Sequence, residues 1–146
     1  MRIENSNFDG ILIDYQTFKF GKVYFFKNII VSEINEGIVL TYDIAEQFLR
    51  LIDKYYDEQQ NVVYISNRVN SYSVKPIDWL KINNKYKNLI AIGIIHYNRN
   101  SKNIFDIEKL FCRRTFKGFD NLEDGLVWAN HIANKRTYNN PVSKKN

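Results

Sequence analysis

Two short apolar runs with a helical pattern between them constrain the fold of this chain more than any other feature. The runs are VVYIS at Val62–Ser66 and LIAIGIIHY at Leu89–Tyr97. Both are rich in β-branched residues and bounded by polar segments, which is typical of strands that are buried on both faces. Between them, Pro76 stands where proline favours the first turn of a helix. A strand, a helix and a second strand predict parallel neighbours joined by a right-handed crossover.

Further elements are expected on both sides of this unit. The aromatic-rich run Phe18–Phe26 and the run Ile29–Ile34 predict an antiparallel hairpin with a turn at Lys27-Asn28. Apolar residues at helical spacing predict further helices after Thr41, between Ser101 and Phe111, and after Asp120, while residues 115–119 allow one more strand.

The predicted fold is therefore of the α/β class. Its order is β-β-α-β-α-β-α-(β)-α, which gives a mixed sheet with an N-terminal antiparallel hairpin and with helices packed on it. We expect a single domain over residues 1–134, followed by a flexible basic tail over residues 135–146.

The composition excludes several classes of protein. Cys112 is the single cysteine among 146 residues, so neither a disulfide framework nor a multi-cysteine metal site can form within the chain. The longest apolar run, Leu89–Ile95, is far shorter than the roughly 20 residues of a membrane helix. The first ten residues contain no apolar signal-peptide core. We therefore expect a cytoplasmic protein without a membrane span.

The net charge of +5 at first favours nucleic acid as a partner. However, residues 113–146 carry seven basic and three acidic residues, so most of the excess lies towards the C-terminal end. Charge in a tail mainly increases solubility. We therefore do not expect nucleic acid to be a partner.

Three stretches carry a resemblance to a known family: Ile34–Asp53, Asn61–Val74 and Arg113–Ala129. In the spacing and order of their elements they resemble the SpoIIAA-like superfamily, which groups STAS and Sec14-like domains. The chain is most similar to the small bacterial SpoIIAA-like proteins of unknown function, over about residues 18–133. The resemblance implies a mixed sheet flanked by helices and no agreed enzymatic activity.

The resemblance also bears on phosphorylation. In the branch of STAS domains that antagonises anti-sigma factors, a phosphorylatable serine follows the third strand. The corresponding stretch here is Ser66–Pro76, which implies Ser71 and Ser73 as possible phosphorylation sites. The stretch is longer than in that branch and lacks its Asp-Ser-Ser-Gly type of sequence, which is a departure from the pattern.

The polar run after the first buried strand is the candidate binding site. Its residues are Asn67, Arg68, Asn70, Ser71, Tyr72 and Ser73. Open α/β sheets bind ligands at the carboxyl ends of their strands, and the guanidinium of Arg68 can hold a carboxylate or a phosphate. The alternative is that these side chains only satisfy the loop backbone and cap the next helix.

The sequence contains no nucleophile–base pair, glycine-rich phosphate loop or metal-ligand spacing, so we expect no enzyme, no cofactor and no metal. The first hypothesis is a cytoplasmic protein-interaction or regulatory module that acts through residues 67–75. Its partner would be another protein or a second copy, in a homodimer formed through the N-terminal hairpin. The alternative is a carrier of a small apolar or anionic ligand, which needs a cavity of roughly several hundred Å³ between sheet and helices.

Overall fold

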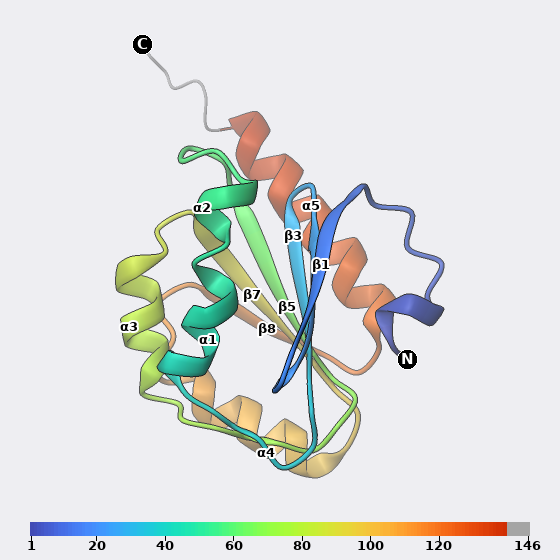
Figure 1. The fold of residues 1–146 in the computed structure, drawn as a ribbon, viewed down its shortest axis with the longest axis vertical. Coiled ribbons are helices and arrows are strands. Elements are labelled where there is room, and N and C mark those ends of the chain that lie inside the picture. Colours follow the sequence, from blue (N-terminus) through green and yellow to red (C-terminus); the bar gives the residue numbers. More distant parts are fainter. Residues whose placement is uncertain (140–146) are drawn as a thin grey trace.

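One mixed sheet of six strands forms the centre of the molecule, in the order β1-β2-β3-β5-β7-β8 (Figure 1). The computed structural model describes residues 1–139. β5 (Val62–Arg68) and β7 (Leu89–His96) are parallel neighbours in the interior of the sheet, with Tyr64 opposite Ile92. Every residue of β5 is buried. The prediction that the two apolar runs form adjacent interior strands is therefore confirmed.

The N-terminal part of the sheet is antiparallel. β2 (Gly21–Phe26) and β3 (Ile29–Ile34) form the expected hairpin. The prediction that its first strand begins at Phe18 is wrong, because Phe18 ends a separate strand, β1 (Leu12–Phe18), which pairs with β2 and forms one edge of the sheet. Gly21 follows the turn between β1 and β2 with a φ of 150°, a conformation that glycine adopts without steric cost.

Helices cover both faces of the sheet (Figure 1). One face carries α1 (Tyr42–Leu49), α2 (Ile52–Tyr55), α3 (Asp78–Lys85) and α4 (Arg99–Lys109), and the other carries α5 (Leu122–Asn139). Successive strand residues point to opposite faces, so Tyr64 packs in the core on the α1 side while Val63 and Ile65 pack in the core on the α5 side.

A second sheet of two strands lies beyond the carboxyl ends of β3 and β5. It pairs β4 (Val39–Leu40) in parallel with β6 (Ser73–Val74). The loop expected over residues 67–75 is therefore shorter than predicted: its first two residues extend β5, and Ser73-Val74 form β6.

The C-terminal part of the described chain contains β8 (Thr115–Phe119), which pairs in parallel with β7 at the other edge of the sheet. α5 then runs to Asn139. Residues 135–139 are thus helical, although the sequence predicted a tail from residue 135. The rest of the predicted basic tail, residues 140–146, lies outside the described residues. Among residues 1–139, no helix is both long and apolar enough to cross a membrane.

Candidate functional site

Asn67 and Arg68 are the last two residues of β5, and the pairing with β7 continues to Arg68 opposite His96. The expectation that both side chains belong to a polar loop is wrong, since they are 0% and 4% exposed. Neighbouring residues of a strand point to opposite faces, so the two side chains enter two different polar networks. Together these networks form the candidate site at the carboxyl end of β5.

The first network surrounds Arg68 and Glu108, a residue of α4. Nη1 and Nη2 of Arg68 donate hydrogen bonds to Oε2 and Oε1 of Glu108 at 2.5 and 2.8 Å. Trp79 Nε1 donates to the same Oε1 at 2.9 Å, and Arg68 Nε donates to Tyr72 Oη and to Ser66 Oγ at 3.1 Å each. Paired arginine–carboxylate bonds of this kind are among the strongest in proteins. The guanidinium of Arg68 does bind a carboxylate, but that carboxylate belongs to Glu108 of the same chain.

Tyr64 lies beside this network, under α1 and α3. Its hydroxyl is 2.5 Å from Ser32 Oγ, and burial raises the pKa of Tyr64. The phenol therefore remains protonated at neutral pH. A neutral phenol bonded to a neighbouring strand helps to hold the strand ends together and does not act as a base.

A cavity of ≈ 20 Å³ lies next to Tyr64 and Trp79, between the sheet and the helices α1 and α3. This space has room for roughly one water molecule. It is much smaller than the several hundred Å³ expected of a carrier.

The other predicted residues range from buried to exposed. Tyr72 is buried, with its hydroxyl 2.7 Å from Ser66 Oγ. Asn70 is half-buried and its Nδ2 donates to the carbonyl of Ile34 at 3.1 Å. Ser71 and Ser73 are exposed. Of the six predicted residues, the two serines are the ones that face solvent most fully.

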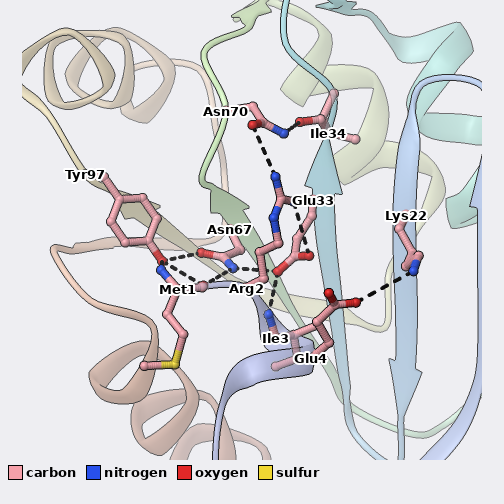
Figure 2. A network of polar contacts seen from close by, with 10 residues as sticks. All are labelled: Met1, Arg2, Ile3, Glu4, Lys22, Glu33, Ile34, Asn67, Asn70 and Tyr97. Carbon is pink, nitrogen blue, oxygen red and sulfur yellow. Dashed lines mark hydrogen bonds and ion pairs between the residues drawn. The ribbon is translucent and has the colours of Figure 1, made fainter.

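The second network joins Asn67 to residues 1–5, which we call the N-terminal strap (Figure 2). Asn67 Nδ2 donates to Glu33 Oε2 at 2.7 Å and to the carbonyl of Met1 at 2.9 Å. The N–H of Ile3 donates to the same Oε2 of Glu33 at 2.7 Å. Tyr97 Oη donates to Asn67 Oδ1 at 2.6 Å. Burial and the nearby Glu33 carboxylate raise the pKa of Tyr97 to about 12.

Sequence reasoning missed the residues that pair with Asn67 and Arg68. Glu33 and Glu108 lie 34 and 40 positions away from them, so local spacing carries no sign of either contact. The sequence positions of both glutamates do carry a weaker sign that they are buried. Glu33 is a charge inside the apolar run of β3, and Glu108 follows Ile104 by four positions on the apolar side of its helix. When the apolar pattern of a strand or helix predicts that a charged side chain is buried, that side chain needs a hydrogen-bonding or oppositely charged neighbour.

Cys112 and His96 show no sign of chemical activation. Burial raises the pKa of the Cys112 thiol, which disfavours the nucleophilic thiolate. Burial lowers the pKa of His96, whose ring lies against Phe105. Within residues 1–139, no three His, Cys, Asp or Glu side chains come together in a way that could hold a metal ion.

Comparison with known proteins supports the fold. No protein-family model matches the sequence, and no curated protein matches it. One solved structure that is similar to this one is that of an uncharacterised protein of the DUF3478 family, with a SpoIIAA-like fold, from Shewanella loihica PV-4. The TM-score is 0.52 at 19% sequence identity, and the match covers 85% of this chain and 97% of that chain. The chain therefore has the SpoIIAA-like fold that its sequence resemblance predicted.

Proposed function

We propose that this protein is a non-enzymatic binding module that contacts a protein partner through the outer side of its two-stranded sheet. We call this side the ribbon surface and define it as Val39, Ser71, Ser73 and Lys75. All four side chains are exposed. Tyr72 and Val74 alternate with them and point inward, and Val39 stands opposite Ser73 in the pairing of β4 with β6.

The observation that carries this proposal is the rigid backing of an exposed surface. Backbone hydrogen bonds of 2.9 to 3.1 Å join Gly37 to Ser71, Ser73 to Ile38, and Lys75 to Leu40. On the inner side of the two-stranded sheet, the hydroxyl of Tyr72 is bonded to Arg68 and Ser66. A surface that is already ordered loses little conformational entropy when a partner binds.

The chemistry of the ribbon surface indicates what it would bind. Val39 is 55% exposed and offers an apolar contact to a partner. The serine hydroxyls and the ammonium group of Lys75 beside it donate hydrogen bonds. A matching partner offers an apolar side chain to Val39 and a carboxylate or carbonyl groups to the residues around it.

The carrier hypothesis receives less support from the geometry. The cavity between the sheet and the helices α1 and α3 measures ≈ 20 Å³, and the guanidinium that would hold an anionic ligand is bonded to Glu108. The polar side chains at the strand end are bonded to one another, which also favours a binding module over an enzyme.

The test is affinity capture from the source cells with matched variants. Val39→Asp places a charge in the centre of the ribbon surface, while Val127→Asp places the same charge on α5, where Val127 is 70% exposed. We expect a partner that the wild type and Val127→Asp retain equally and that Val39→Asp loses. Recovery of the same set of proteins by all three baits would reject the proposal.

Phosphorylation of Ser71 or Ser73 would regulate this surface. A phosphate adds about −1.5 to −2 charges at neutral pH, and Ser73 stands opposite Val39. We expect Ser73→Glu to mimic Val39→Asp in the capture experiment. Intact-mass spectrometry of protein from its own cells checks whether the modified form exists, and a spectrum without it would count against this regulation.

A further inference from the structure

The N-terminal strap lies at the carboxyl ends of β3 and β5, on the same face of the sheet as α5 (Figures 1 and 2). Ligands of open α/β sheets bind at this end of the strands. Here the position is taken by a piece of the chain itself. The contacts between the strap and the sheet therefore describe what this position recognises.

Glu33 is the centre of these contacts. It is 4% exposed, although a buried carboxylate is costly unless hydrogen-bond donors surround it. One donor, the amide of Asn67, belongs to the sheet. The other direct donor is the N–H of Ile3, and Arg2 Nη1 lies 4.0 Å from Oε1 of Glu33. The strap thus completes the hydrogen bonding of a carboxylate that the sheet alone satisfies only in part.

The strap is held by both its backbone and its side chains. The N–H of Ile3 and the carbonyl of Met1 bond to Glu33 and Asn67, and any peptide can supply such groups. The side chains add selectivity. Ile3 is 6% exposed within the core on the α5 side, and Nη2 of Arg2 donates to Oδ1 of Asn70 at 3.4 Å. In this structure the position therefore holds an arginine followed by a branched apolar residue.

We propose that Glu33, Asn67 and Tyr97 form a binding site for a peptide segment, and that the strap is its built-in occupant. The external ligand is a segment of a partner protein that carries an arginine followed by a branched apolar residue, as in Arg2-Ile3. This site is separate from the ribbon surface and does not rest on the function proposed for it.

The strap competes with such a ligand. A tethered segment acts at an effective concentration on the order of millimolar, so the closed strap weakens the apparent affinity of the site for a free peptide. Releasing the strap should reveal the site. Ile3→Asp does so in the full chain, because a charged side chain cannot remain in the apolar core and adds a second negative charge at the residue whose N–H binds the Glu33 carboxylate. Arg2→Glu acts in the same direction at an exposed position and is less of a threat to folding.

The probe is an acetylated and amidated peptide with the sequence MRIENS and a fluorophore at its C-terminal end, and binding is followed by fluorescence anisotropy. We expect Ile3→Asp and Arg2→Glu to bind it at least about tenfold more tightly than the wild type. Adding Glu33→Gln to either variant should weaken binding by about tenfold or more, because a charge-assisted hydrogen bond is lost. Adding Glu36→Gln, the same chemical change at an exposed position, should leave binding within about twofold.

Val39→Asp should also leave binding of this probe unchanged, so failure of the ribbon surface and failure of the strap site give different results. If both released variants are folded by circular dichroism and neither binds the probe better than the wild type, the proposal is wrong. Binding that does not respond to Glu33→Gln overturns it as well. Sedimentation analysis tests whether the strap of a second copy of this chain occupies the site instead. If the wild type is a dimer and Glu33→Gln dissociates it, the strap of a second copy occupies the site. That result would overturn the proposal that the ligand is a segment of a partner protein.

Discussion

At the scale of single residues, Arg68 and Glu108 form a fully buried ion pair. Their side chains are 3% and 0% exposed, so each loses almost all of its hydration on folding. The loss is offset because the two groups bond to each other twice and because Trp79 donates to the same carboxylate. A pair of this kind contributes little net stability, but either partner left alone is strongly destabilising.

We therefore predict that Glu108→Gln lowers the free energy of unfolding by about 3–5 kcal/mol, because it leaves a buried guanidinium without its counter-charge. Urea unfolding followed by circular dichroism measures the change. Asp106→Asn is the matched control, since its carboxylate is on the same helix and 58% exposed. The control should cost no more than about 0.5 kcal/mol. Equal losses in the two variants would contradict the prediction.

The six candidate site residues show what sequence reasoning can reach at this scale. It identified the end of the strand after Val62–Ser66 as the place where polar side chains gather. It could not assign Asn67 and Arg68 to opposite faces, because that depends on how far β5 continues. It also missed Glu33 and Glu108, because the fold brings them to this point from distant parts of the chain. The sequence thus indicated where polar side chains gather, whereas it did not indicate which residues they bond to.

At the scale of elements, the central strands were predictable and the N-terminal ones were less so. β5 and β7 are buried on both faces, which produces uninterrupted apolar runs in the sequence. β1 is an edge strand in which exposed residues alternate with half-buried ones, so its sequence LIDYQTF has no comparable run. The polar contacts of the strap join its backbone groups to the side chains of Glu33 and Asn67, far away in the chain, and backbone contacts leave little trace in the sequence of the strap.

β1 also exposes a sheet edge with apolar neighbours: Ile11 is 65% and Tyr15 52% exposed. Edges of this kind pair with other chains unless something blocks them. Asp14 supplies a block: its Oδ1 accepts the N–H of Tyr15 at 2.8 Å, and its Oδ2 accepts the hydroxyl of Tyr55 at 2.5 Å. The bond from Tyr55 lowers the pKa of Asp14 most, and the bond from Tyr15 lowers it further. The Asp14 carboxylate therefore stays ionised, and keeps covering the strand edge, into the acidic pH range.

Asp14→Ala should free the N–H of Tyr15 and promote pairing of β1 with β1 of a second copy. We expect the dimerisation constant to rise by roughly fivefold or more, as one released hydrogen-bond donor finds a new acceptor. Sedimentation velocity over a range of protein concentrations measures this rise. Asp9→Ala is the control, because Asp9 is exposed and precedes β1. The homodimer predicted from the sequence would then form through β1, at the edge of the sheet, rather than through β2. Identical sedimentation of Asp14→Ala and Asp9→Ala would argue against this mode of pairing.

At the scale of the whole molecule, the sheet separates two polar networks, and both include residues at the carboxyl end of β5. Arg68 anchors the ribbon through Tyr72 on one face, and Asn67 holds the strap on the other. Neighbouring residues of one strand thus support both proposed binding surfaces. A shift of this strand end would alter both surfaces together, whereas substitutions at Val39 or Ile3 address them one at a time.

The whole molecule is also expected to be sensitive to alkali, because several tyrosines are buried in it. Burial raises the pKa of Tyr24 to about 12, and it raises the pKa of Tyr56, Tyr64 and Tyr86 further. In the unfolded chain these phenols ionise near pH 10.0. Protons are therefore lost first from the unfolded state, so the contribution of these tyrosines to stability is constant below pH 10 and falls as the pH rises towards their folded-state pKa values.

We predict that Tyr56 and Tyr64 each remove about 1.4 kcal/mol from the free energy of unfolding for every pH unit above 10. Urea unfolding at pH 9, 10 and 11, with ionisation followed by absorbance at 295 nm, measures this slope. Tyr56→Phe isolates one contribution, because its hydroxyl makes a single bond of 2.6 Å to the carbonyl of Phe26. The variant should be less stable than the wild type at pH 9 but should lose stability less steeply at higher pH. Parallel slopes would mean that Tyr56 ionises as freely in the folded state as in the unfolded one, and that the core admits water at that position.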